Sequence, residues 1–268
     1  MVSEALFLDH WINIDSERLT RYETMYQWSD AAEAFYAPAK IGAGQVLVDF
    51  GCGPGHTAVE FAQRVGAAGH VHALDINAEF IKRTQARAEA IGLAERITAQ
   101  VLTTERLPLP DAAVDRITAR NTIIYVRDPV STFKEFRRVL KPGGMAHAIE
   151  SDWSLTAVEP LAAEWRALVA AASWAWRTPE IGRKLYGIAR SAGFSNVTLR
   201  VLTKPDTDGR LLGMIETVAG YARKSDQLET TQIDAMLAKL KRSLVEGNYL
   251  AVTPQFLVTA TTSTADTP

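Results

Sequence analysis

From about residue 45 to residue 153, two hydrophobic patterns alternate along the chain. Short apolar runs typical of buried strands are VLVDF, VHALDI, ITAQVL, DRITAR and GMAHAIES. Between them lie amphipathic stretches with apolar residues at helical spacing, among them HTAVEFAQRV, AEFIKRTQARAEAIG and DPVSTFKEFRRVL. Strands that alternate with helices are joined by right-handed crossovers and form a parallel sheet with helices on both faces. The pattern therefore predicts a doubly wound α/β fold.

The same pattern divides the chain into segments of one domain. Helical spacing precedes the first strand, and a tryptophan-rich helical region follows the strand run that ends near residue 153. In order, we expect a helical cap over residues 1–42, the alternating core over 43–153, a helical lid over 154–190, a segment over 191–262 that completes the sheet with further helices, and a tail over 263–268.

Composition narrows the classes of protein that fit. The 268 residues are 47% hydrophobic and 22% charged, with a net charge of -2, which is typical of a soluble globular protein without a nucleic-acid-binding surface. The single cysteine, Cys52, excludes an intramolecular disulfide and a multi-cysteine metal cluster. No stretch resembles a secretion signal or a membrane span. We expect a cytoplasmic protein with no membrane or nucleic-acid partner.

The stretch VLVDFGCGPG carries the clearest functional signal. Gly51, Gly53 and Gly55 follow the first predicted strand, where ligands of open α/β sheets bind. Glycines permit sharp turns and close approach of a ligand, and the helix that follows offers free N–H groups. A nicotinamide-dinucleotide fingerprint would be G-x-G-x-x-G. Here the third glycine comes one position early, and Asp49 stands two places before the first glycine.

Asp49 with the G-x-G-x-G run resembles the cofactor motif of class I S-adenosylmethionine-dependent methyltransferases. HALDIN, TERLPLPDAAVDRI and EFRRVLKPGGMAHAIE follow in the family's order, and the last resembles the subgroup of ubiquinone-biosynthesis and small-molecule methyltransferases. The resemblance covers about residues 43–152. It implies a Rossmann-like, seven-stranded sheet of order 3-2-1-4-5-7-6 with an antiparallel last strand, for which QFLVTAT is the candidate.

The resemblance also implies how S-adenosylmethionine is held. Asp75 ends the second strand, where the family binds the ribose hydroxyls, and Ile76 is placed to pack on adenine. Thr103 stands where relatives often have an aspartate for the adenine amino group, and the backbone of Thr104 meets the ring. Asn121 borders the methionine part of the cofactor. The expected cofactor residues are Tyr26, Asp49, Gly51, Cys52, Gly53, Gly55, Asp75, Ile76, Thr103, Thr104 and Asn121.

The methyl acceptor is predicted to lie beside residues that follow the fourth and fifth strands and beside the N-terminal cap. Tyr22 and Tyr26 share a helix face and can close over the cofactor or pack on the core. The candidates on the acceptor side are Tyr26, Tyr125, Glu150, Asp152 and Trp153. Of Trp174 and Trp176, which cannot share a helix face, we expect one in the core and the other toward the pocket. Asp152 or a tyrosine can serve as a base if the nucleophile arrives protonated, but no catalytic residue is assigned.

These observations predict an enzyme that transfers a methyl group in line from S-adenosylmethionine to an oxygen, nitrogen or carbon of a small molecule, aromatic or apolar in character. The product of the cofactor is S-adenosylhomocysteine, and no metal is required. A quinone-ring C-methyltransferase is one alternative. A nicotinamide-dependent oxidoreductase, which the glycine spacing disfavours, and a non-catalytic cofactor-binding module are the others. Both a monomer and a homodimer fit the sequence.

Overall fold

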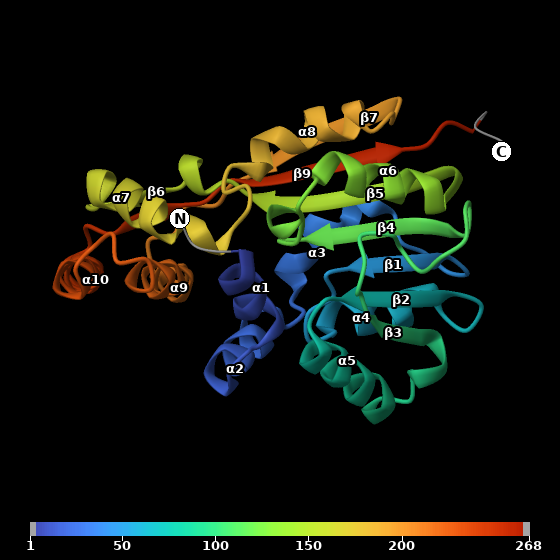
Figure 1. Cartoon of the computed structure of the whole chain (residues 1–268), viewed down its shortest axis with the longest axis horizontal. Coiled ribbons are helices and arrows are strands. Elements are labelled where there is room, and N and C mark those ends of the chain that lie inside the picture. Colours follow the sequence, from blue (N-terminus) through green and yellow to red (C-terminus); the bar gives the residue numbers. More distant parts are fainter. Residues whose placement is uncertain (1–3, 265–268) are drawn as a thin grey trace.

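The central element of the computed structural model, which describes residues 4–264, is a seven-stranded sheet (Figure 1). Its strand order is β3-β2-β1-β4-β5-β9-β7. The first five are parallel, and β9 is antiparallel to both of its neighbours. The strands are β1 Val46–Phe50, β2 His70–Asp75, β3 Ile97–Val101, β4 Val114–Arg120, β5 Leu140–Ser151, β7 Asn196–Leu202 and β9 Gln255–Thr261. Because β6 and β8 lie outside this sheet, β7 and β9 are its sixth and seventh strands. The predicted order and the antiparallel last strand are both confirmed.

Helices cover both faces of the sheet because its strands are apolar on both sides. On β1, for example, Leu47 and Val48 are both fully buried, in two different hydrophobic clusters, since neighbouring residues of a strand point to opposite faces. The helices on the Leu47 side are α3 Asp30–Tyr36, α4 His56–Val65 and α5 Ala78–Ala90. Those on the Val48 side are α6 Pro129–Val139 and α8 Ile181–Ser191.

The remaining helices lie beside the carboxyl ends of the parallel strands (Figure 1). They are α1 Glu4–Ile12, α2 Ser16–Met25, α7 Ala162–Ala172, α9 Leu212–Arg223 and α10 Thr230–Val245, with a two-stranded sheet of β6 Ala157–Glu159 and β8 Leu250–Val252. Short 3-10 helices are η1 Ala37–Ala39, η2 Ala94–Arg96, η3 Ile123–Tyr125, η4 Trp153–Leu155 and η5 Ser173–Ala175. These helices therefore border the carboxyl ends of the strands, where ligands bind in this architecture.

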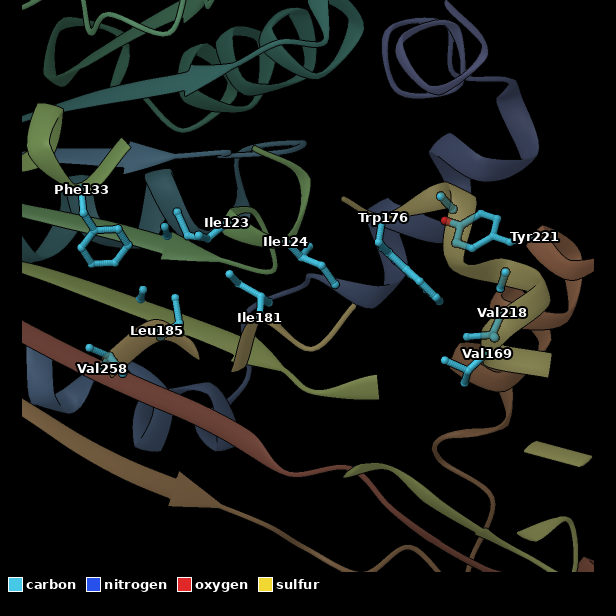
Figure 2. Packing of buried hydrophobic residues seen from close by; sticks show 14 of the residues in the cluster. Ile123, Ile124, Phe133, Val169, Trp176, Ile181, Leu185, Val218, Tyr221 and Val258 are labelled. Atoms are coloured by element: carbon cyan, nitrogen blue, oxygen red, sulfur yellow. The ribbon is translucent and has the colours of Figure 1, made fainter. Parts of the chain in front are cut away.

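One hydrophobic cluster runs from the sheet into the helices after residue 154. Figure 2 shows Phe133 of α6 and Leu185 of α8 at one end of this cluster, and Val169 of α7 and Val218 of α9 at the other. Trp176 lies between them (Figure 2). Because the core is continuous, the predicted lid region packs as part of the main domain, and α8 within it packs against β5 and β9.

The buried ring of Phe61 on α4 gives a test of this packing. It is fully buried, and its centroid lies 5.2 Å from that of Tyr36 and 6.4 Å from that of Trp28. We expect Phe61→Ala to lower the free energy of unfolding by about 3–5 kcal/mol, because it removes buried area and leaves a cavity. Val245→Ala, at a residue that is 89% exposed, should change it by less than about 0.5 kcal/mol. Urea denaturation measures both; equal effects would contradict the packing.

Candidate cofactor and active site

The loop after β1 is built around glycines in the left-handed region. Gly51, Gly53 and Gly55 have φ angles of +76°, +53° and +85°. A Cβ added to Gly51 would lie 2.2 Å from Oγ1 of Thr122, and one added to Gly55 would lie 2.5 Å from Oγ1 of Thr84. Both the backbone conformation and the close packing therefore require glycine at Gly51 and Gly55. The first contact brings the loop after β4 against the loop after β1.

Asp75, at the carboxyl end of β2, ties that strand to the glycine loop. Its Oδ2 accepts a hydrogen bond from the Gly53 N–H at 2.9 Å, and its Oδ1 accepts one from the Asn77 N–H at 2.9 Å. Burial raises the pKa of Asp75 to about 6, against the effect of these two donors. The carboxyl group is thus held in a fixed orientation beside the loop.

Three further predicted cofactor residues lie at the same edge. Leu102 donates its N–H to the Asp75 carbonyl oxygen at 2.7 Å, which places the start of the following loop beside the end of β2. Thr103 and Thr104 come next and are exposed, as is Ile76, at 43%. Apolar and hydroxyl side chains are therefore open to a ligand beside Asp75.

Asp49 is a buried carboxyl group in the middle of the parallel sheet. The Thr118 hydroxyl donates to its Oδ1 at 3.3 Å, whereas its Oδ2 has no hydrogen-bond partner among the described residues. Burial raises the pKa of Asp49 to about 7. A buried acceptor of this kind is normally satisfied by a ligand or by water. Cys52 is also buried and is a free thiol. Burial raises the pKa of this thiol, so Cys52 is not a reactive thiolate.

Glu150, near the end of β5, holds the loop after β4. Its Oε1 accepts the N–H groups of Thr122 at 2.8 Å and Ile123 at 2.6 Å, and its Oε2 has no partner among the described residues. The side chain is fully buried, and this burial raises its pKa to about 8. In the same loop Asn121 has a φ of +50° and donates its Nδ2 hydrogen to the Tyr26 hydroxyl at 3.4 Å. The predicted neighbours of the methionine part are thus in contact.

Aromatic side chains from several segments gather beside these loops. The rings of Tyr22 and Tyr26 are stacked, with centroids 5.8 Å apart and planes 6° apart. Additional pairs, given by their centroid distances, are Tyr125 with Trp11 at 4.2 Å, Trp153 with Trp176 at 4.9 Å, and Trp176 with Tyr221 at 5.8 Å. Figure 2 shows Trp176 and Tyr221 side by side. We call Trp11, Tyr125, Trp153, Trp176 and Tyr221 the aromatic cluster.

The two lid tryptophans are both held by the surrounding structure. Trp176 is 5% exposed and belongs to the aromatic cluster, while Trp174 is partly buried and donates its indole N–H to the Tyr221 carbonyl oxygen at 2.9 Å. Both pack on the hydrophobic core. Which of the two faces an acceptor stays a prediction, and the stacking of Trp176 on Trp153 favours Trp176.

Asp152 is engaged by the protein on both oxygens. Arg183 binds it with Nε at 2.6 Å from Oδ2 and Nη2 at 2.7 Å from Oδ1. Its Oδ1 also accepts the N–H groups of Ser154 and Leu155, at 3.1 Å and 3.2 Å. The side chain is fully buried. These contacts favour a structural role for Asp152 over the role of a base that the sequence allows.

Comparison with known proteins identifies the family. Residues 47–144 match the model of a methyltransferase domain. The ubiquinone/menaquinone biosynthesis C-methyltransferase UbiE of Brucella anthropi is 30% identical over 210 residues, which cover 78% of this chain and 75% of that enzyme. The chain belongs to the class I S-adenosylmethionine-dependent methyltransferases. Its cofactor is S-adenosylmethionine.

Further relatives and solved structures resemble this chain. A protein of transposon TN4556 from Streptomyces fradiae is 29% identical over 221 residues, 81% of this chain and 62% of that protein. The phosphoethanolamine N-methyltransferase 2 of Haemonchus contortus, solved with S-adenosylhomocysteine, has a TM-score of 0.65 at 17% identity; the match covers 98% of this chain and 61% of the other. A putative methyltransferase of Bacillus halodurans has a TM-score of 0.63 at 19% identity, over 88% of this chain and 100% of the other.

The geometry fits this cofactor. The glycine loop leaves space that side chains would fill, Asp75 is placed at the end of β2, and Asp49 and Glu150 each keep one buried oxygen without a partner. Within residues 4–264 no group of three or more His, Cys, Asp or Glu side chains is arranged to hold a metal ion. In the same part of the chain no helix has the length and apolar character needed to span a membrane.

Contacts that the sequence analysis missed attach the N-terminal helices to this methyltransferase core. Glu23 of α2 accepts hydrogen bonds from His56 at 3.0 Å and from Arg87 at 2.5 Å. Asn77 donates its Nδ2 hydrogens to the carbonyl oxygens of Trp11 and Ile12, at 3.0 Å and 3.1 Å. Each pairing joins residues more than 30 positions apart in the sequence, so no local sequence pattern predicts it.

A substitution of Asp75 tests the cofactor site. We expect Asp75→Ala to weaken S-adenosylhomocysteine binding by about 10–100-fold, because hydrogen bonds to a charged group contribute about 1.5–3 kcal/mol. Asp234→Ala, on α10, removes a surface partner of Arg223 of α9 and should leave the affinity unchanged. Isothermal titration calorimetry measures both. Equal affinities for wild type and Asp75→Ala would contradict the placement of the cofactor beside Asp75.

Glu150 predicts a pH dependence of stability. Its pKa is about 8 in the folded protein and ordinarily 4.5, so the folded state keeps a proton that the unfolded chain releases. The free energy of unfolding therefore falls as the pH rises from 4.5 to about 8, by at most about 1.4 kcal/mol per pH unit for this one group. Glu150→Gln keeps an oxygen for the N–H groups of Thr122 and Ile123 and removes the titration. We expect urea denaturation between pH 5 and pH 8 to give a shallower slope for the variant; parallel slopes would contradict the raised pKa.

Proposed function

We propose that the protein transfers a methyl group from S-adenosylmethionine to a small molecule whose reacting part is aromatic or apolar. The observation that carries this proposal is the aromatic cluster beside the Tyr26–Asn121 contact. Its rings come from α1, η3, η4, α9 and the segment after η5. Large apolar surfaces of this kind favour a flat or apolar partner.

On the cofactor side, each part of S-adenosylmethionine is assigned to residues already at the carboxyl edge. Asp75 binds the ribose hydroxyls, and Ile76, Thr103 and Thr104 border the adenine ring. The glycine loop, supported by Asp49, and Asn121 border the methionine part, and Tyr26 closes over it. The contacts of Asp75 with Gly53 and of Asn121 with Tyr26 support this arrangement.

The sulfonium of the cofactor supplies a methyl group that is already electrophilic, so the protein has to align a nucleophile with it and keep water away. Aromatic faces suit this task, since they exclude water and attract a cation through their electron-rich faces. Among the acceptor-side candidates, Tyr26, Tyr125 and Trp153 have the aromatic rings that can do this. Alignment can supply several kcal/mol without any covalent step on the protein.

A nucleophile that arrives protonated needs a proton acceptor, and Glu150 is better suited than Asp152. Both oxygens of Asp152 are occupied, whereas Oε2 of Glu150 has no hydrogen-bond partner among the described residues. Burial raises the pKa of Glu150 to about 8, close to the working pH, where a general base is most effective. Tyr26 and Tyr125 lie within the range at which the charge of Glu150 raises their pKa.

A second candidate function is C-methylation of a quinone ring. It is supported by the similarity to the UbiE enzymes of Brucella anthropi and Brucella abortus, each 30% identical over three quarters of this chain. A quinol ring also fits the flat, aromatic character of the cluster. We further propose that the protein is located in the cytoplasm. We also propose that two segments select the acceptor, the helical cap over 1–42 and the lid over 154–190.

A methyl-transfer assay tests the proposal. Purified protein with S-adenosylmethionine and a panel of phenols, quinols, amines and carboxylic acids should give one product in which a methyl group has replaced a hydrogen, detected by mass spectrometry. We expect Trp153→Ala to raise KM for that acceptor about 10-fold or more while the affinity for S-adenosylhomocysteine is unchanged, since a buried aromatic contact contributes a few kcal/mol. Cofactor binding without any product across the panel would instead favour a non-catalytic module.

A further inference from the structure

Arg120 is the last residue of β4 and stands at the point where the strand order reverses. The neighbours of β1 are β2 on one side and β4 on the other, so the loops after β1 and β4 diverge and leave a crevice at their carboxyl ends. Arg120 directly precedes Asn121, whose side chain meets Tyr26. A cation is therefore placed at the mouth of the cofactor site.

The guanidinium of Arg120 is flanked by two aromatic rings and forms no ion pair among the described residues. Its Cζ lies 4.9 Å from the ring centroid of Phe35 and 5.8 Å from that of Tyr26. Its Nε is buried and has no hydrogen-bond partner, and none of the ion pairs among residues 4–264 involves it. The rings offset part of the cost of burying this charge, but the N–H donor stays unsatisfied.

Other arginines near the same edge differ in this respect. Arg87 binds Glu23 and the Pro54 carbonyl oxygen, and Arg183 binds both oxygens of Asp152. Of these three arginines, Arg120 alone has a buried Nε without a hydrogen-bond partner among the described residues. Such a group is placed to bind an anion that the protein itself does not supply.

The surroundings of Arg120 point to one end of the cofactor. Its positive charge and a hydrogen bond from its side chain to the Tyr36 hydroxyl both oppose the rise that burial causes in the pKa of Tyr36. Tyr36 belongs to α3 and packs on Phe61 of α4, the helix that follows the glycine loop. Arg120 thus lies between the N-terminal cap and the glycine loop, beside the residues assigned to the methionine part.

S-adenosylmethionine carries one anionic group, the carboxylate of its methionine part, beside a cationic ammonium and a cationic sulfonium. A partly buried arginine is compatible with this ligand only where it meets the carboxylate, since it repels both cations. We propose that Arg120 binds the methionine carboxylate of the cofactor. This inference rests on the assignment of the cofactor, and it concerns cofactor binding without any acceptor present.

The experiment compares two ligands that differ only in the carboxylate. They are S-adenosylhomocysteine and its decarboxylated analogue, which keeps the adenosine, the sulfur and the amine. Calorimetry with wild type should show tighter binding of S-adenosylhomocysteine. We expect Arg120→Met to weaken S-adenosylhomocysteine by about 10–100-fold and the analogue by less than about 3-fold, because only the first ligand loses a charge-assisted hydrogen bond.

Two further variants keep the result interpretable. Arg116 lies on the same strand as Arg120, and its Nε donates to the Ala39 carbonyl oxygen at 2.9 Å. Arg116→Met should leave the preference between the two ligands as in wild type. Arg120→Lys keeps the charge and should retain more of the preference than Arg120→Met. Melting curves confirm that each variant is folded.

Other outcomes would overturn the proposal. An equal loss for both ligands in Arg120→Met would show that Arg120 only supports the site, as would an unchanged affinity for S-adenosylhomocysteine. If the acceptor's anion were the true partner, neither ligand would be affected in the absence of an acceptor. Wild-type protein that bound neither ligand would refute the cofactor assignment itself, which separates that failure from the failure of the Arg120 proposal.

Discussion

The close packing of Thr122 on Gly51 is the contact on which the functional edge depends. It holds the loop after β4 against the loop after β1, and it exists only because Gly51 has no side chain. Glu150 fixes the same loop from the other side, since its Oε1 accepts the N–H groups of Thr122 and Ile123. Asn121 and Tyr125 therefore lie on a loop that Gly51 contacts on one side and Glu150 on the other. The cofactor loop and the acceptor side are thereby positioned by one set of backbone contacts.

A second constraint is the attachment of the N-terminal helices. Trp11 of α1 accepts from Asn77 in the cofactor half and donates its indole N–H to Ala175 in the lid region at 3.1 Å. Arg21 of α2 likewise reaches Thr217 of α9 at 3.1 Å. The helical cap therefore connects the glycine-loop half of the sheet with the helices after residue 154.

Local patterns predicted most of the core. The strand-and-helix alternation predicted the five parallel strands. The resemblance to the methyltransferase family, carried by the glycine motif and HALDIN, supplied the rest: QFLVTAT as the antiparallel strand beside β5, which the structure confirms, and Asp75 as the ribose ligand, which stays a prediction. Arg120 and Trp11 carried no such signal. Their importance depends on what surrounds them, namely Tyr26 and Tyr125, which are brought close only by tertiary folding.

Asp152 is a residue whose local sequence pattern suggested a role that tertiary contacts disfavour. A carboxylate at the end of a strand is a reasonable candidate for a base, but Arg183, 31 residues later, binds both of its oxygens. The methyltransferase model that matches this chain ends at residue 144, whereas Trp153, Trp176 and Tyr221 all follow it. Most of the aromatic cluster thus lies in the part of the chain that the family does not specify. Since a methyl donor is common to the family and acceptors differ, we propose that this later segment, together with Trp11 and Tyr125, selects the acceptor.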